Sequence, residues 1–253
     1  MSEAATPRGA PGVLVPALVA LAAFIVFIGL GTWQLERKAW KENLIATLAE
    51  RMSAPPSPVP PRGEWQNLTP AADEFRRVRM RAQFDPRNEA RVYSGGMGLR
   101  DDVKSPGYFA FAPARLADGA AVVVVNRGHV DNPNADASLK PIAVPESAID
   151  VVGALRWPEP PGWFVTPYSE RQDLWFARDH RAMAQRYGWG EVAPFYIEME
   201  SPAPPGGVPR PGRLAVKLRN DHLGYALTWF GLAAVLVGVF GFWARSRRRE
   251  KIA

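Results

Sequence analysis

Histidine is the side chain on which metal chemistry in this chain would depend. The 253 residues include three histidines and no cysteine. The lack of cysteine excludes a disulfide framework, a zinc ribbon, an iron–sulfur cluster and a thiolate nucleophile. His129 follows an apolar run and is expected in a turn or at the surface, and His180 is expected to be solvated in a short helix. His222 differs because it directly precedes a long uncharged run.

The residues that follow His222 have the spacing of one helical face. They are Tyr225, Ala226, Trp229 and Ala233, at i+3, i+4, i+7 and i+11. An earlier apolar run ends at the same membrane depth with Trp33 and Gln34. Within that run, Gly29 and Gly31 would let a flat ligand or the other helix approach closely.

Two interpretations of this stripe remain open from the residues alone. The first is an aromatic belt at a membrane surface, with a histidine that reaches water. The second is a neutral imidazole presented to a haem iron, with the apolar ring and tail in lipid. In the second, Arg219, Lys217 or Arg37 could meet the propionates.

Other chemistry-bearing patterns are weaker. The chain has no G-x-S-x-G, H-E-x-x-H or P-loop motif. The glycine-rich run at 95–98 favours a hairpin or mobile loop, and Asp101-Asp102 favours a solvated turn. We expect no copper site, because soft copper ligands would be cysteines or clustered methionines and the methionines here are scattered. A membrane-anchored hydrolase would lack its nucleophile and base.

Two uncharged runs predict membrane-spanning helices at residues 12–33 and 223–243. The first would be about 33 Å long as a helix, enough for a hydrocarbon core of about 30 Å. It exceeds the apolar region of a signal peptide and ends in Thr32-Trp33-Gln34 rather than in a cleavage site, which favours a retained anchor.

The net charge of +6 is concentrated after the second span, where the last nine residues carry five basic groups and one acid. Such a cluster is typical of a cytoplasmic flank and not of a nucleic-acid-binding face. We therefore expect both tails, 1–11 and 244–253, in the cytoplasm and the central domain on the other side. The basic residues Arg37, Lys38 and Lys41 oppose this orientation, but long loops translocate largely regardless of charge.

Proline-rich stretches delimit the central domain. We expect a juxtamembrane segment and linker at 34–62, a domain at 63–200 and a second linker at 201–222. Strands are predicted by alternation or by β-branched runs, and they lie at 78–84, 89–93, 121–126, 148–155 and 194–198. A short helix is predicted at 180–187 between an Asp179 N-cap and Gly188. The expected fold class is α+β, with two transmembrane helices flanking a mainly antiparallel β domain, either barrel-like or a sandwich.

Four ordered sequence blocks resemble the surfeit locus protein family of cytochrome c oxidase assembly factors, in its bacterial-type form. They are Gly31–Leu35 with Arg37 and Trp40-Lys41, Val125–Gly128, Gly153–Pro158 with Pro161–Phe164, and Asn220–Phe230. Two positions depart from the family pattern. His129 stands where tryptophan is frequent, and Asp221 where asparagine is frequent.

The resemblance implies a non-enzymatic chaperone in the cytoplasmic (inner) membrane with a periplasmic domain. Such a protein would receive haem a from haem a synthase and help insert it into the large subunit of the oxidase. The haem-ligating histidine of the family maps onto His222, with Tyr225, Trp229, Trp33 and Arg219 as expected haem contacts. The alternative is a scaffold that stabilises oxidase intermediates through its β domain, around Arg127, without haem.

Overall fold

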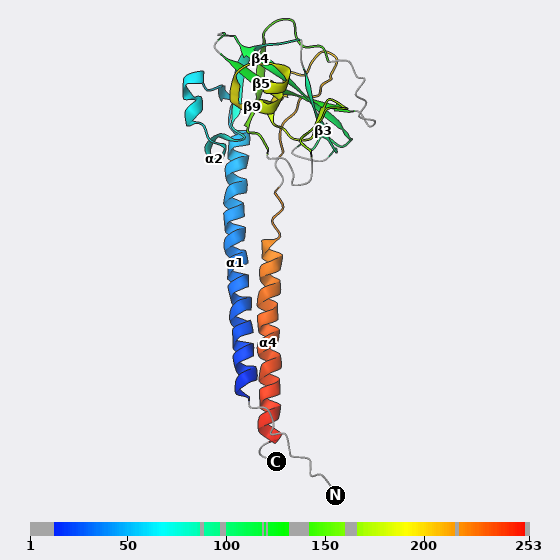
Figure 1. The fold of residues 1–253 in the computed structure, drawn as a ribbon. Helices are drawn as coiled ribbons and strands as arrows, with labels where there is room; N and C mark the ends of the chain where they lie inside the picture. Colours follow the sequence, from blue (N-terminus) through cyan, green and yellow to red (C-terminus); the bar gives the residue numbers. More distant parts are fainter. Residues whose placement is uncertain are drawn as a thin grey trace. The chain divides into compact units, whose positions relative to one another are not determined.

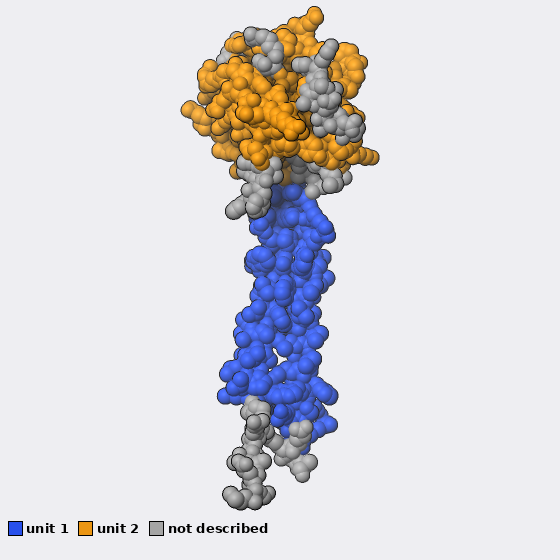
Figure 2. Space-filling model, turned by 45° about the vertical axis from the view of Figure 1, so that its right-hand side comes forward, with its two compact units in different colours: residues 1–46, 218–253 blue, residues 47–217 orange. Residues whose placement is uncertain are grey.

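The structure is a computed structural model, which describes residues 13–86, 89–96, 100–117, 119, 121–131, 142–159, 166–215 and 218–250. The tail at 1–11, the block Pro161–Phe164 and Lys217 lie outside these residues. The chain divides into two compact units, coloured separately in Figure 2. One unit, residues 1–46 and 218–253, contains most of a helix pair, and the other, residues 47–217, contains a β domain.

The helix pair consists of α1 (Leu14–Ser53) and α4 (His222–Glu250), which run side by side in opposite directions (Figure 1). Both helices are long and apolar enough to cross a membrane. Helix α1 continues for 20 residues beyond Trp33, because residues 34–53 contain neither proline nor glycine. An ion pair of 2.7 Å between Lys38 and Glu42, four residues apart, supports this extension.

The β domain contains a closed ring of five strands. In ring order these are β2 (Arg77–Phe84), β6 (Ile149–Arg156), β9 (Val192–Ser201), β5 (Val122–Asp131) and β4 (Gly107–Leu116). The ring closes because β2 pairs with β6 along one edge and with β4 along the other. The remaining short strands extend the sheet, and they are β1 (Ser57–Pro58), β3 (Ala90–Ser94), β7 (Tyr168–Ser169) and β8 (Leu174–Trp175).

The expectation of a mainly antiparallel sheet needs correction, because the sheet is mixed. Strand β5 pairs with β9 in parallel, and so do β1 with β2 and β3 with β8. A parallel pair needs a long crossover connection. Here the chain between β5 and β9 supplies one, which includes β6 to β8 and helix α3 (His180–Tyr187).

Local sequence patterns account for most of these elements. On β2 the alternating residues Val78, Met80, Ala82 and Phe84 are buried, as predicted. Strand β5 is buried on both faces, which confirms the interpretation of its valine run. Helix α3 has its predicted limits: the Asp179 carboxylate accepts from the first backbone amides, and Gly188 ends the helix at φ 67°. Two further short helices, η1 (Arg62–Asn67) and α2 (Pro70–Asp73), precede β2.

Candidate functional site

His222 is the first residue of α4, and its imidazole contacts α1. Its Nδ1 lies 2.7 Å from Oε1 of Gln34. With the amide oxygen as acceptor, Nδ1 carries the proton of the neutral ring and Nε2 keeps a lone pair. A hydrogen bond from the ring nitrogen that does not face the metal is what orients a metal-ligating histidine. The residue type and its partner therefore suit a single axial ligand.

Beneath His222 the two helices are in direct contact. The rings of Phe27 and Trp229 stack with centroids 5.8 Å apart. A Cβ on Gly31 would collide with the ring of Phe230, so the close approach at this glycine is made by the other helix. Around Gly29 no atom lies within 4 Å of an added Cβ. Of these two glycines, Gly29 therefore has open space beside it, and Gly31 is used in helix packing.

The predicted haem contacts do not all converge on His222. Tyr225 is 59% exposed and Trp33 is 53% exposed. Arg219 has a side chain 88% exposed and pairs with the carboxylate of Asp221. Trp229 faces α1, as do the fully buried alanines at 226 and 233. A step of three residues leaves Tyr225 at the edge of the face, because it advances only about 300° around a helix.

The departure at Asp221 has a local structural role. Its carboxylate pairs with Arg219 rather than with the imidazole of His222, and its backbone carbonyl accepts from the amide of Tyr225 at 3.3 Å in the first turn of α4. Arg37, another residue considered for the propionates, lies over the ring of Trp40 at 4.0 Å. Among the described residues there is no cluster of three or more potential metal ligands.

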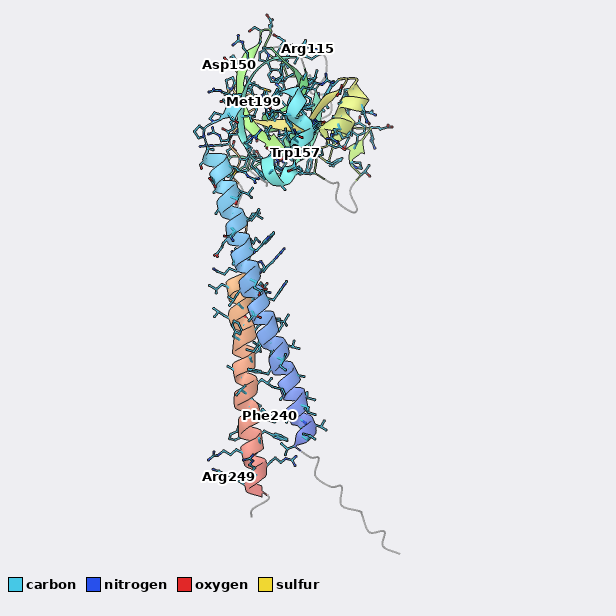
Figure 3. All side chains as sticks on the ribbon, turned by 90° about the vertical axis from the view of Figure 1, so that its left-hand side faces the viewer. Arg115, Asp150, Trp157, Met199, Phe240 and Arg249 are labelled. Carbon is cyan, nitrogen blue, oxygen red and sulfur yellow. The ribbon has the colours of Figure 1, made fainter. Side chains whose placement is uncertain are left out.

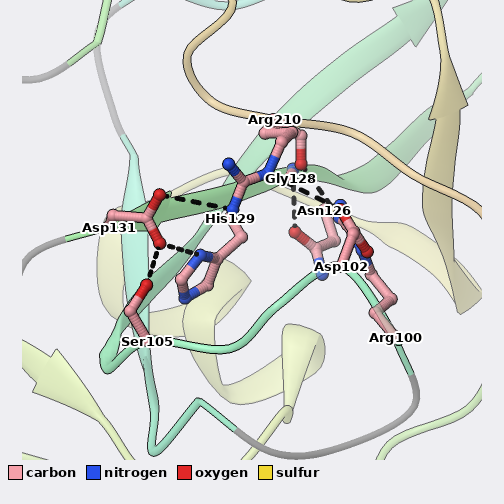
Figure 4. Close-up of polar contacts among 8 residues, drawn as sticks. All are labelled: Arg100, Asp102, Ser105, Asn126, Gly128, His129, Asp131 and Arg210. Carbon is pink, nitrogen blue, oxygen red and sulfur yellow. Dashed lines mark hydrogen bonds and ion pairs between the residues drawn. The ribbon is translucent and has the colours of Figure 1, made fainter.

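A second polar cluster lies in the β domain, at the segment Val125–Gly128 that the sequence marked out (Figure 4). The amide of Asn126 donates to Glu198 at 2.8 Å, and its Oδ1 accepts from the Gly128 amide at 3.1 Å. Gly128 has φ 130°, and a Cβ there would collide with the backbone of Arg210. Glycine is therefore required at this position.

Arg127 is buried in an ion pair with Glu89, which is also buried. Its Nη1 lies 3.2 Å from Oε2 of Glu89 and donates to the carbonyl of Ile142, while Nη2 donates to the carbonyl of Ala143. Burial lowers the pKa of Arg127 and raises the pKa of Glu89, and the attraction between the two charges opposes both shifts. Through Arg127, these contacts connect strand β5 to Glu89 and to the backbone of residues 142–143.

The expectation of a turn or surface position for His129 is wrong. The residue lies inside β5 with its side chain fully buried, next to the ring of Phe109. Its Nδ1 lies 3.3 Å from Oδ1 of Asp131, and Ser105 donates to that same carboxylate oxygen (Figure 4). Burial lowers the pKa of His129, so the ring is neutral at pH 7. Because the serine bonds the aspartate and not the histidine, the three residues do not form a nucleophile–base pair.

The cluster around His129 ties the segment after β9 to the barrel. His129 and Arg210 exchange two backbone hydrogen bonds, of 2.9 and 2.8 Å. Arg100 donates to the carbonyl of Arg210 at 2.9 Å and pairs with Asp102, which lowers the pKa of that carboxyl group. The predicted turn at Asp101-Asp102 is present, with Asp102 paired as well as exposed.

His180 is also buried, contrary to the expectation of a solvated ring. Its Nε2 lies 2.9 Å from the carbonyl oxygen of Ala193 on β9, and the ring packs near Tyr196. Burial lowers the pKa of His180 to about 4. Of the three histidines, only His222 belongs to the helix pair and keeps some exposure to solvent.

The sequence places Gln34 at the depth of His222 but does not mark it as the partner of the imidazole ring. It does not mark Arg210 either, whose backbone pairs with β5. The one signal for Gln34 is a polar amide directly after an apolar run, because such a side chain needs a hydrogen-bond partner. No comparable signal existed for Arg210, because its contact is made through the backbone.

Comparisons with known proteins assign the chain to a family. The sequence model of the SURF1 family matches residues 21–234. Surfeit locus protein 1 of Rattus norvegicus is 33% identical over 227 residues, covering 83% of this chain and 71% of the rat protein. The Homo sapiens protein of the same name is 32% identical over 221 residues, with the same coverage. A SURF1-like protein of Monosiga brevicollis is 32% identical over 234 residues, covering 87% and 84% of the two chains. The chain belongs to the SURF1 family.

Proposed function

We propose that this protein is a membrane-anchored assembly factor for cytochrome c oxidase that carries haem a to the large catalytic subunit. Membership of the SURF1 family supports the oxidase as the target. The hydrogen bond between His222 and Gln34 carries the assignment of the haem ligand. It directs the Nδ1 proton to Gln34, so the neutral tautomer has its lone pair on Nε2 at the outer end of an apolar helix, and this lone pair is the donor that a haem iron takes.

In this proposal the cargo supplies an iron with an open axial position and two anionic propionates. His222 donates the lone pair of Nε2, and Gln34 keeps Nδ1 protonated and the ring oriented. Arg219 meets a propionate by exchanging its exposed partner Asp221 for the new carboxylate. A single histidine ligand suits transfer, because one bond has to break when the haem moves on to the oxidase.

The proposed location is the cytoplasmic (inner) membrane, with both termini in the cytoplasm and the β domain in the periplasm. The arginines at the end of α4 support this orientation by the positive-inside rule. Haem a synthase is the proposed donor and the large subunit of the oxidase is the proposed acceptor.

The test is to purify the wild-type protein and His222→Ala from cells that make haem a and to record their absorption spectra. We expect haem in the wild-type protein and at least a tenfold lower content in the variant. Leu227→Ala is the control on the same helix, and it should retain haem because the Leu227 side chain is 64% exposed and is not among the proposed haem contacts. Equal haem content in wild type and His222→Ala would contradict the ligand assignment.

A haem-independent scaffold is a second candidate, favoured by a cavity in the β domain. Beside Arg127 lies an apolar pocket of about 570 Å³, with walls that include Phe84, Met199 and the proline-rich segment 202–209. A pocket of this size and lining is a frequent place for an apolar anchor of a partner. Val208 is a partly exposed wall residue whose replacement by glutamate would put a charge there.

Val208→Glu and His222→Ala distinguish the two functions when oxidase assembly is measured in cells. The scaffold requires that assembly fails in Val208→Glu and survives in His222→Ala. The haem carrier requires the reverse. Folding of the β domain in Val208→Glu is checked by circular dichroism, so that loss of assembly can be attributed to the surface.

A further inference from the structure

The helix pair has an apolar groove at the end away from His222. The groove encloses about 340 Å³ between α1 and α4. Small side chains create it, with Ala17 and Ala20 on α1 and Gly241 on α4, and the ring of Phe240 forms part of its wall. No atom lies within 4 Å of a Cβ built on Gly241, so the space beside this glycine is open.

Two arginines continue the lining face of α4 beyond the groove. Arg247 follows Phe240 by seven residues, and Arg248 follows Gly241 by seven. Seven residues make about two turns and about 10 Å of rise, so these side chains lie on the same face as the groove, one step further along the axis. Arg249, which Figure 3 labels together with Phe240, instead follows Phe242 by seven residues, and Phe242 is 78% exposed.

Among the side chains that the structure describes, the arginines at this end of the helix pair have no acidic partner. None of Arg245, Arg247, Arg248 and Arg249 forms an ion pair with another residue that the structure describes, and Arg247 lies over the ring of Trp243 at 5.5 Å. Helix α1 begins at this end and has no acidic residue in its first turn, so its free backbone amides add a positive helix dipole.

We propose that this end of the helix pair is a binding site for one anionic phospholipid. One acyl chain lies in the groove beside Gly241, and the phosphate lies against Arg247 and Arg248. The two features fit one ligand, because an acyl chain fills an apolar groove and a phosphodiester pairs with guanidinium groups. Arginines that only set the membrane topology could lie on any face of α4, whereas arginines that bind this lipid have to lie on the groove face. The proposal does not depend on haem binding by His222.

The experiment is native mass spectrometry of the full chain, released from nanodiscs that contain equal amounts of phosphatidylglycerol and phosphatidylethanolamine. We expect the wild-type protein to retain phosphatidylglycerol in preference. In Arg247→Gln/Arg248→Gln this retention should fall by about fivefold per arginine, the usual effect of a basic residue near an anionic lipid surface. In Gly241→Leu, the retention of both lipids should fall, because leucine fills the groove.

Each variant has a matched control. Arg245→Gln/Arg249→Gln removes the same charge from positions turned further from the groove, with Arg245 at the edge of the groove face and Arg249 beyond it, and leaves the same number of arginines to set the topology. Gly238→Leu adds the same side chain at a helical glycine that also has open space around it but does not line the groove. Both controls should retain phosphatidylglycerol as the wild type does.

Three outcomes would overturn the proposal. Equal loss in the two double-arginine variants would mean that only total charge matters. Equal retention of the two lipids by the wild-type protein would mean a generic acyl-chain slot without head-group recognition. Unchanged retention in Gly241→Leu would mean that the groove is not the site. The double-arginine variants lie at the exposed helix end, so their result does not depend on helix packing at Gly241.

Discussion

The helix pair and the β domain distribute polar side chains in opposite ways. Among the described residues, every largely buried polar or charged side chain belongs to the β domain, including Arg127, His129 and His180. All but three of the large exposed apolar side chains belong to the helix pair. The β domain therefore has the surface and interior of a protein in water, and the helix pair has the surface of a protein in hydrocarbon.

This difference changes what a polar contact means in each region. In the β domain, buried polar and charged side chains are numerous and make hydrogen bonds or ion pairs, such as Arg127 with Glu89, that hold segments of the barrel together. In the helix pair, the hydrogen bond between His222 and Gln34 lies at the edge of an apolar surface, where a polar pair is a candidate for function. If the buried contacts of the β domain are structural and the His222–Gln34 contact is functional, variants of the first should change stability and variants of the second should change haem content.

The largest effect is expected at the buried ion pair of the barrel. Arg127→Ala leaves the carboxylate of Glu89 buried without its partner, which should lower the free energy of unfolding by about 3–5 kcal/mol. Urea unfolding of the full chain, followed by near-ultraviolet circular dichroism, measures the change. Arg81→Ala is the control, because Arg81 and Asp150 form an exposed pair that contributes about 1 kcal/mol or less. Similar losses in both variants would show that burial does not set the cost.

Gly128→Ala should follow, because it strains the backbone and creates a collision. The residue has φ 130°, and the added Cβ would meet the backbone of Arg210. We expect a loss of about 3 kcal/mol and faster proteolysis after Arg210, since the segment has to move away from β5. Gly188→Ala has a positive φ of 67° but open space around it, and it should cost about 1 kcal/mol. If Gly128→Ala costs no more than that, the contact with Arg210 is not a constraint.

Local sequence patterns were sufficient to predict helix α3 and strands β2 and β5. Consecutive residues show the caps of α3, the alternation of β2 and the valine run of β5. Strand β4 was missed. Its sequence from Gly107 to Leu116 mixes aromatic residues, alanines and Pro113, and it has no period of two. Its pairing with β2, which closes the barrel, is a long-range contact that no local pattern specifies.

The positions of His129 and His180 could not be predicted for a similar reason. Each has polar neighbours in the sequence, which suggested exposure, and each is covered by a segment distant in the chain. The backbone of Arg210 pairs with that of His129, and β9 packs on His180. At the candidate haem site, the helical spacing predicted Trp229 on one face of its helix with His222, and only the structure showed that its ring stacks on Phe27 of α1.

A pH-dependent effect is expected from the buried His180. Its pKa is about 4 in the folded protein and about 6.5 when unfolded, so the folded state favours the neutral ring. The unfolded chain binds more protons between these values, and stability therefore falls as the pH decreases from about 6.5 to about 4. This shift should lower the free energy of unfolding by about 3 kcal/mol at pH 4 and should leave it unchanged at pH 7. His180→Asn should flatten this part of the urea-unfolding profile. An unchanged slope would assign the pH dependence to other groups.

The smallest effect is expected from Gln34, the hydrogen-bond partner of His222, and it concerns haem content. Gln34→Leu removes the acceptor of the Nδ1 proton, so the ring loses its orientation while Nε2 stays available. Loss of the group that hydrogen-bonds the other ring nitrogen of a ligating histidine typically lowers metal affinity by about tenfold or more. Haem content after purification should therefore fall in Gln34→Leu, but less than in His222→Ala, and Gln34→Glu should retain it because a carboxylate is a stronger acceptor. Gln34 has no role in the barrel, so urea unfolding of the β domain should be the same in all three variants. If Gln34→Leu keeps its haem while His222→Ala loses it, the ring is oriented by the cargo and not by α1, and the polar contact of the helix pair is then a consequence of packing.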